Sequence, residues 1–346
     1  MTGRAMGHLS PHHTHFAHQR PTFAAIDLGT NNCRLLVAVP QKTGFRVVDA
    51  YSQIVRLGEG VVAHGRLSEG AMDRTLKALT MCAAKMEKRG VTASRSIATQ
   101  ACRAAQNGPA FLDRIEKETG LPLEVISPEE EAALSVKGCQ DLIDSGAKAA
   151  LVFDIGGGST ELSWLKVISQ NGHIKTTLQA WTSLPYGVVS VAETYGQEDI
   201  AAQAFDLLAE EVAQHVAKIP VPDFIQEAFD QGQAHLVGTS GTVTSLAGIH
   251  LKLEKYNRQA VDGLWLSESD IQHTSTFLRG LTVEARAHQS CIGQDRADLV
   301  VPGCAILAGI MKVWPAARIR VGDRGLREGV LMELMEAWRQ SQPAKK

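Results

Sequence analysis

Leu151-Val-Phe-Asp-Ile-Gly-Gly-Gly-Ser-Thr-Glu-Leu162 carries the strongest structural signal in this chain. An apolar run ends in Asp154 and three consecutive glycines, which predicts a buried strand that enters a tight turn. Glycines let a backbone approach an anion closely, and Ser159 and Thr160 add hydroxyl donors. Asp154 and Glu161 flank the turn, and carboxylates beside a phosphate site are ligands that Mg²⁺ prefers. The alternative is a glycine hairpin whose acids face solvent.

A second segment, Ala24-Ala-Ile-Asp-Leu-Gly-Thr-Asn-Asn-Cys-Arg-Leu-Leu36, has the same design. Both segments run from an apolar strand through Asp, an apolar residue, Gly and a small polar turn into another apolar strand. A strand–turn–strand unit repeated at domain spacing indicates two related domains that face each other across a cleft. Each domain is expected to contribute one phosphate-binding hairpin. Neither segment has the glycine pattern of a dinucleotide fold or a P-loop.

Length and composition exclude several classes of protein. A chain of 346 residues with 44% hydrophobic residues can form two domains with ample cores. The net charge of −2 argues against a nucleic-acid-binding surface. The six cysteines lack Cys-x-x-Cys spacing, no signal peptide is evident, and the most apolar stretch, Leu299 to Trp314, is too short to span a membrane. These features predict a cytoplasmic protein that binds neither membranes nor nucleic acids.

A helix start at Ser127-Pro-Glu-Glu-Glu-Ala132 contains a second group of acids. Ser127 fits the N-cap, and Glu130 fits the return position of a capping box. Glu131 lies about 100° further around the helix and is not needed for the cap. Simple complementation of the helix dipole is the alternative explanation for the three acids. Because this helix joins the two halves of the chain, its start is expected at the floor of the cleft.

Other segments suggest further anion contacts. Arg103 follows a strand end, where open sheets usually bind ligands, although a lone arginine is more often a surface residue. Gly238-Thr-Ser-Gly-Thr-Val-Thr244 forms a small-residue turn before a helix, which predicts either an anion site or tight packing. Arg324 and Arg327 flank a glycine turn near the last helix.

Scaffold elements are also predicted. A strand is expected over 45–56, and Ser68 should start a helix that ends before Gly90. Ser267 and Asp270 should cap a later helix. The final helix is expected to end near Arg339.

Six motifs together resemble the exopolyphosphatase/guanosine-pentaphosphate phosphatase (Ppx/GppA) family of the actin-like, ribonuclease-H-like ATPase superfamily, over residues 23 to 335. The motifs are Asp27-Leu-Gly-Thr-Asn-Asn-Cys-Arg34, Ala98-Thr-Gln-Ala-Cys-Arg103, Ile126-Ser-Pro-Glu-Glu-Glu-Ala132, Asp154-Ile-Gly-Gly-Gly-Ser-Thr-Glu161, Leu184-Pro-Tyr-Gly-Val188 and Gly325-Leu-Arg-Glu-Gly-Val330. The chain departs from the family at Asn32, where serine is usual, and in the third turn, where Gly-Gly-Thr is common.

The resemblance implies an α/β fold with two ribonuclease-H-like (actin-like) domains that face each other across an active-site cleft. Residues 1–20, with five histidines, are expected to be a disordered tail. Residues 21–128 would form the N-terminal domain and residues 129–326 the C-terminal domain. The final helix, about 327–340, would pack back on the N-terminal domain.

The resemblance also implies the site. Glu131 would be the catalytic glutamate, with Arg103 assisting, and Asp154, Glu161 and Asp27 would bind Mg²⁺, with Mn²⁺ as an alternative. The expected phosphate-binding residues are Gly29, Thr30, Asn31, Asn32, Cys33, Arg34, Gly156, Gly157, Gly158, Ser159, Thr160, Gly238, Thr239, Ser240, Gly241 and Arg327.

The expected reaction is release of terminal orthophosphate from inorganic polyphosphate by direct attack of water. Guanosine pentaphosphate is the alternative substrate. A non-catalytic sensor of guanosine alarmones and an actin-like sugar kinase are less favoured. A homodimer is left open. Longer relatives continue into a helical C-terminal region, so distributive rather than processive hydrolysis is expected here.

Overall fold

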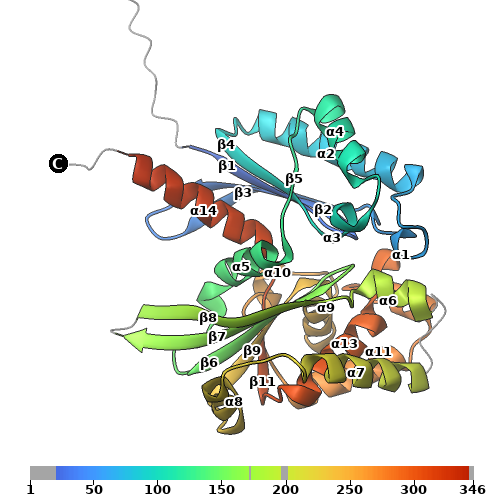
Figure 1. The fold of residues 1–346 in the computed structure, drawn as a ribbon, viewed down its shortest axis with the longest axis vertical. Helices are drawn as coiled ribbons and strands as arrows, with labels where there is room; N and C mark the ends of the chain where they lie inside the picture. The colour runs from blue at the N-terminus through green and yellow to red at the C-terminus, as the bar shows by residue number, and fades with distance from the viewer. Residues whose placement is uncertain (1–20, 171–172, 196–201, 343–346) are drawn as a thin grey trace, which may run out of the picture.

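The computed structural model describes residues 21–170, 173–195 and 202–342. Two β-sheets, each with its own helices, lie above and below a central region that contains α5 (Pro128–Gly138) (Figure 1). The predicted histidine-rich tail, residues 1–20, lies outside the described residues.

The first sheet has the strand order β3-β2-β1-β4-β5. β1, β2 and β3 form an antiparallel meander, and β4 and β5 run parallel to β1. Its strands are β1 (Phe23–Leu28), β2 (Asn32–Pro40), β3 (Phe45–Ile54), β4 (Ala93–Ala98) and β5 (Glu124–Val125). Its neighbouring helices are α1 (Val61–His64), α2 (Glu69–Lys88), α3 (Gln100–Ala104) and α4 (Gly108–Thr119).

The second sheet repeats this topology. Its order is β10-β11-β9-β6-β7-β8, in which β6, β7 and β8 form the antiparallel meander and β9 and β11 run parallel to β6. The repeat predicted from the two hairpin sequences is therefore confirmed. The strands are β6 (Ala149–Ile155), β7 (Thr160–Gln170), β8 (His173–Leu184), β9 (Ala234–Thr239), β10 (Trp265–Ser267) and β11 (Arg318–Val321). The helices are α6 (Val188–Tyr195), α7 (Ala202–Val216), α8 (Asp223–Asp230), α9 (Ser240–His250), α10 (Arg258–Val261), α11 (Glu268–Arg279), α12 (Val283–Ala287) and α13 (Val300–Val313).

Strand alternation divides the core of the first sheet into two layers. Ala24, Ile26 and Leu28 of β1 pack toward α2 and α4, whereas Phe23 and Ala25 pack toward α5 and α14 (Leu326–Ser341). This is the two-residue period of a strand that is covered on both faces. The last helix of the chain thus packs against β1, β2 and β4 of the first sheet, and Figure 1 shows it beside β1.

Close contact between α5 and α14 fixes the position of the central helix. A Cβ on Gly138 would lie 2.0 Å from the carbonyl oxygen of Gly325, and a Cβ on Gly329 would lie 2.1 Å from that of Leu134. Only glycine permits this approach of two backbones. The start of α5, which carries the three glutamates, is therefore held between the two sheets.

Most scaffold predictions are confirmed, with shifted ends. α2 begins after its Ser68 cap, and α11 has the predicted capping box of Ser267 and Asp270. The strand expected over 45–56 ends at Ile54, because Arg56 adopts a left-handed conformation with φ 46°. α14 continues to Ser341, slightly beyond its predicted end.

Two further observations concern the cysteines and the question of a membrane-spanning helix. All six cysteines are buried and free. Among the described residues, no helix is both long and apolar enough to cross a bilayer.

Candidate active site

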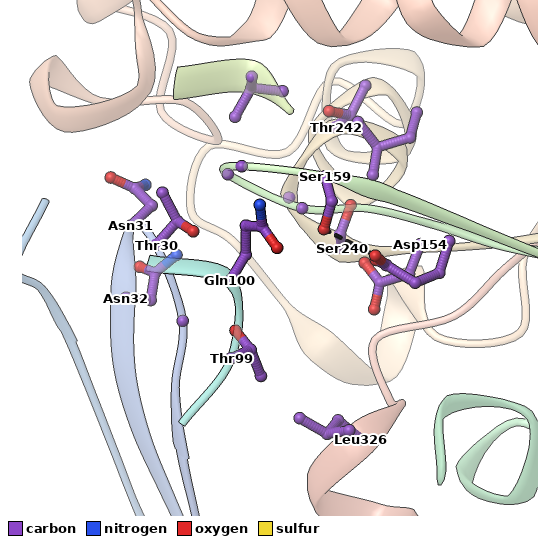
Figure 2. Close-up of a pocket in the computed structure, with 18 of the residues that line it drawn as sticks. Thr30, Asn31, Asn32, Thr99, Gln100, Asp154, Ser159, Ser240, Thr242 and Leu326 are labelled. Atoms are coloured by element: carbon purple, nitrogen blue, oxygen red, sulfur yellow. Dashed lines mark hydrogen bonds between the residues drawn. The ribbon is translucent and has the colours of Figure 1, made fainter. Parts of the chain in front are cut away.

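The two predicted hairpin turns lie against each other between the sheets. A Cβ on Gly157 would lie 2.9 Å from Cβ of Thr30 and 3.2 Å from the backbone nitrogen of Asn31. In Figure 2, Thr30, Asn31 and Asn32 from the first hairpin face Ser159 and Asp154 from the second, with Gln100 between them. The sequence repeat therefore brings both turns into one site.

The turns enclose a cavity of about 120 Å³. It is lined by residues from both hairpins, the end of β4, α5 and the starts of α6, α9, α13 and α14. They include Asp27, Gly29, Thr30, Asn31, Asn32, Arg34, Thr99, Gln100, Glu131, Asp154, Gly156, Gly157, Gly158, Ser159, Glu161, Val188, Ser240, Gly241, Thr242, Arg296 and Leu326.

Both turns present backbone donors that the protein leaves unused. Among the described residues, the N–H groups of Thr30, Asn31, Gly157, Gly158 and Ser159 donate to no protein acceptor. Each turn is closed instead by a single backbone bond of 2.9 Å, from Gly29 or Gly156 to the carbonyl three residues later. Free N–H groups that converge on a cavity form an anion-binding concavity.

The start of α6 fixes the orientation of the second turn. The N–H groups of Val188 and Val189 donate to the carbonyls of Gly156 and Gly157 at 2.9 and 2.8 Å. Gly187 makes this packing possible, because a Cβ there would lie 2.3 Å from the Gly157 carbonyl group. The Leu184-Pro-Tyr-Gly-Val188 motif therefore supports the second glycine turn from outside the cavity.

A third turn contributes a strained serine. Ser240 begins α9 with φ 81°, a conformation that residues other than glycine rarely adopt. Its hydroxyl is buried and has no hydrogen-bond partner in the structure. Buried strain and an orphaned hydroxyl at a helix N-terminus are both typical of ligand sites.

Four carboxyl groups line the same cavity, and the structure raises the pKa of each. Burial raises the pKa values of Asp27 and Asp154, partly offset by the charge of Arg34. Burial raises the pKa of Glu161 to about 7, against hydrogen bonds from Ser159 (2.6 Å) and Ser183 (2.8 Å). Burial and then repulsion by Glu161 raise the pKa of Glu131 well above its ordinary value.

Glu131 and Arg103 form a pair at the floor of the cleft. The Arg103 guanidinium lies 3.3 Å from Oε2 of Glu131, and it also donates to the Ile126 carbonyl at 2.7 Å and to Gln100 at 2.8 Å. Arg103 itself does not line the cavity. It holds Glu131 in place instead of facing the turns.

The neighbouring glutamate corrects one sequence prediction. Ser127 accepts from the N–H of Glu130 at 3.1 Å, as expected for an N-cap. The Glu130 side chain does not return to complete the capping box, because it forms an ion pair with Arg95. A long-range partner has replaced the local one.

The cavity is lined by side chains that can bind a divalent cation, but the described residues do not form a complete set of metal ligands. Among the described residues, no group of three or more Asp, Glu, His or Cys side chains has the geometry of a metal site. Asp27, Glu131, Asp154 and Glu161 line the cavity with carboxylate oxygens, and the side-chain oxygens of Asn31 and Asn32 are buried without partners in the described structure. Hard oxygen donors with raised pKa values fit Mg²⁺, which keeps several waters and takes only one or two carboxylates.

Six predicted site residues do not line the cavity. Cys33 faces the core with no exposed surface, because strand alternation places it opposite Asn32 and Arg34. The Thr160 hydroxyl donates to the Tyr186 carbonyl, and Thr239 donates to that of Phe153. Gly238 packs on Phe153, so the tight-packing alternative applies there. Arg103 is the fifth, and Arg327, which lines an adjoining cavity, is the sixth.

Some cavity residues were missed in the sequence, including Thr99, Gln100, Thr242 and Arg296. Gln100 had a usable signal, because it follows the carboxyl end of β4. Arg296 had none, since it lies in a short 3-10 turn, Gln294–Arg296, far along the chain.

Contacts across the cleft mouth join the two halves of the molecule. The Arg56 guanidinium lies 3.1 Å from the Asp298 carboxylate. The N–H of Gly60 donates to Glu193 of α6 at 2.7 Å. Val55 and Arg56 also donate their N–H groups to the Asn31 carbonyl, which connects the Arg56–Asp298 ion pair to the first hairpin turn.

Two sheets of the same topology, with a glycine-containing hairpin turn from each meeting in one cleft, define a two-domain protein of the actin-like class. The sequence profile of the Ppx/GppA phosphatase family matches residues 36–337, and the chain belongs to this family. The predicted fold class is thereby confirmed.

Individual relatives support the same family. The chain is 31% identical over 333 residues to the guanosine-5'-triphosphate,3'-diphosphate pyrophosphatase of Vibrio parahaemolyticus, which covers 93% of this chain and 61% of that protein. The chain thus spans about three fifths of that relative.

Solved structures resemble the whole chain. The crystal structure of the Aquifex aeolicus member of the Ppx/GppA family has a TM-score of 0.73 at 26% identity, covering 93% of this chain and 99% of that one. An exopolyphosphatase-like protein has a TM-score of 0.76 at 28% identity, covering 92% and 99%. An exopolyphosphatase from Cytophaga hutchinsonii, 24% identical with a TM-score of 0.78 over 91% of this chain and 98% of its own, shares the fold.

Proposed function

We propose that this protein hydrolyses a terminal phosphoanhydride and releases orthophosphate. The observation that carries the proposal is the meeting of two turns with unused N–H groups beside Glu131. Phosphoryl transfer to water requires positioning and charge neutralisation more than covalent chemistry, and this cavity is built for both.

Each residue has a distinct role in the proposed reaction. The N–H groups of the two turns bind the terminal phosphoryl oxygens and neutralise their charge. Glu131 accepts the proton of the attacking water, for which a carboxyl pKa raised toward the working pH is favourable. Arg103 fixes the Glu131 carboxylate at 3.3 Å. Asp154 and Glu161, with Asp27 near them, would hold a divalent cation, which when bound adds neutralisation of phosphoryl charge.

Guanosine pentaphosphate is the substrate we favour. The curated relatives, at about 30–31% identity, are named as guanosine-5'-triphosphate,3'-diphosphate pyrophosphatases. This reverses the preference for polyphosphate drawn from the sequence. Polyphosphate is the second candidate, because the exopolyphosphatase-like protein is 28% identical and matches nearly the whole chain.

Phosphate release from guanosine pentaphosphate, long-chain polyphosphate and tripolyphosphate, measured side by side, tests the proposal. We expect Mg²⁺-dependent release of one orthophosphate per guanosine pentaphosphate without any acceptor alcohol. A requirement for ATP and a sugar would favour the kinase alternative. Binding without turnover by wild-type protein would favour the alarmone sensor. Glu131→Gln protein, purified identically, controls for contaminating phosphatases.

A further inference from the structure

Gln100 lies where the active-site cavity meets the pair formed by Glu131 and Arg103. It is the first residue of α3 and follows the carboxyl end of β4. Its side chain lines the cavity, and a Cβ on Gly158 would lie 2.9 Å from its Cγ. Figure 2 shows the side chain between the two turns. Gln100 therefore packs on the second turn while it also contacts the floor of the cleft.

The hydrogen bonds of Arg103 determine which way the Gln100 amide faces. A guanidinium group can only donate, so the amide atom that contacts it must be the oxygen. The Arg103 guanidinium donates to Oε1 of Gln100 at 2.8 Å. It also donates to the Ile126 carbonyl at 2.7 Å and lies 3.3 Å from Oε2 of Glu131, so three partners fix its position. The opposite orientation of the amide would place two donor groups against each other.

The amide nitrogen of Gln100 keeps its hydrogens available. Among the described residues, Nε2 of Gln100 donates to no protein acceptor. The same holds for the N–H groups of Gly157 and Gly158, in the turn on which Gln100 packs. All three residues line one cavity, although Gln100 belongs to the first domain and the glycines to the second. Donors that are oriented before a ligand arrives can stabilise negative charge on a reacting group.

A purely structural role for Gln100 is the competing explanation. The residue would then only hold Arg103 and, through it, Glu131. That role requires the amide oxygen alone. A carboxylate would serve it better, because a hydrogen bond between two charged groups is stronger than one with a neutral acceptor. The amide therefore adds donors that the structural role does not require.

We infer that Gln100 is a catalytic residue, whose Nε2 group donates a hydrogen bond to the phosphoryl group as that group passes from the substrate to water. This rests on the proposed function and adds one donor to it. In this step the bond from phosphorus to the bridging oxygen breaks, and its electron pair leaves with the shortened phosphate chain. A bond forms from phosphorus to the water oxygen, and the water proton passes to Glu131. Gln100 transfers no proton and only stabilises charge on the phosphoryl oxygens.

Two substitutions separate the donor role from the structural one. Gln100→Met removes the donors and the acceptor, whereas Gln100→Glu keeps an acceptor for Arg103 and removes the donors. With guanosine pentaphosphate and Mg²⁺, both should lower kcat by about 10- to 100-fold, because a hydrogen bond to a charged group is lost, and should change KM much less. Gln106→Met, at an exposed glutamine outside the cavity, is the matched control and should behave as wild type. Wild-type kcat in Gln100→Glu would overturn the proposal.

Calorimetry with orthophosphate and Mg²⁺ gives a readout that does not require turnover. Wild-type protein should bind orthophosphate about 10-fold more tightly than Gln100→Met, since one charge-assisted hydrogen bond is lost. Glu131→Gln should bind it at least as tightly as wild type, because the Glu131 carboxylate offers no donor to a phosphate. Thermal melting checks the fold of each variant.

A role that acts only through Arg103 and Glu131 would leave the orthophosphate affinity unchanged. Equal affinities of wild type and Gln100→Met would therefore overturn the assignment of Gln100 as a phosphate donor. Failure of wild-type protein to release phosphate from any substrate would overturn the proposed function, while the orthophosphate comparison would still decide whether Gln100 contacts phosphate.

Discussion

The β1–β2 and β6–β7 hairpins have the same backbone design but opposite charge. In the first, Asp27 lies directly across the strand pair from Arg34. In the second, Asp154 lies across from Glu161. An acid faces a base in one domain, and an acid faces an acid in the other.

This difference separates the chemistry of two equivalent positions. Arg34 acts against the rise in the pKa of Asp27, whereas Asp154 adds to the rise in the pKa of Glu161, which reaches about 7. Two carboxylates that repel each other are stabilised by a bound cation. An arginine in the equivalent position is stabilised by a bound anion. In the proposed reaction, the first hairpin would therefore face the phosphate and the second would face the divalent cation.

The largest effect is expected at Glu131, which lies between the two hairpins. Glu131→Gln keeps the side chain's size but removes the base, so kcat should fall on the order of 10²- to 10⁴-fold with substrate binding largely kept. Glu130→Gln is the control, since its partly exposed ion pair with Arg95 lies outside the cavity and contributes about 1 kcal/mol or less to stability. Similar losses of kcat in both variants would show that Glu131 is the wrong glutamate.

The two turns should differ in their tolerance of a methyl group. A Cβ on Gly157 would press within 2.9 Å of Thr30 in the opposing turn, whereas a Cβ on Gly29 has no neighbour closer than 3.6 Å. Gly157→Ala should therefore displace the turns and lower kcat/KM by about 10²-fold, and Gly29→Ala should have a small effect. The measurement is steady-state phosphate release. Equal sensitivity of the two glycines would contradict the proposed contact between the turns.

The acids of the two hairpins should differ in their dependence on Mg²⁺. Asp154→Asn removes one member of the self-repelling pair, so the Mg²⁺ concentration for half-maximal rate should rise about tenfold or more. Asp27→Asn should shift the Mg²⁺ titration less, because Arg34 lies opposite that acid. Thermal melting in parallel excludes unfolding. Superimposable Mg²⁺ titrations for wild type and Asp154→Asn would remove the metal role of Asp154.

The smallest expected effect is on stability without divalent cations. Because folding raises the pKa of Glu161 to about 7, the folded protein binds this proton more tightly than the unfolded chain. The stability contribution is complete below the ordinary glutamate pKa and is lost as pH rises through about 7. Relative to Glu161→Gln, wild type should lose about 2–3 kcal/mol between pH 4 and pH 8 in chelator.

Denaturant unfolding across this pH range provides the measurement, and Mg²⁺ should restore the loss at pH 8. Parallel pH profiles for wild type and Glu161→Gln would show that folding does not raise the pKa of Glu161.

The sequence alone determined the features that depend on neighbouring residues. Both hairpins, the glycine turn and the caps at Ser127 and Ser267 follow from short-range patterns of apolar residues, glycines and hydroxyls. The repeated hairpin was sufficient to predict two domains and their cleft. The same pattern of apolar strand, Asp, Gly and polar turn begins the same antiparallel meander in both sheets.

The tertiary structure alone decided which side chains reach the cavity. Cys33 and Asn32 are adjacent in sequence, yet the register of β2 sends one into the core and the other to the cleft. Glu130 of α5 forms an ion pair with Arg95 of β4 and does not complete its local capping box. Arg296 enters the site from a turn far along the chain. The orientation of a side chain, its ion pairs and its pKa depend on burial and on partners that are distant in sequence. A local sequence pattern does not contain that information.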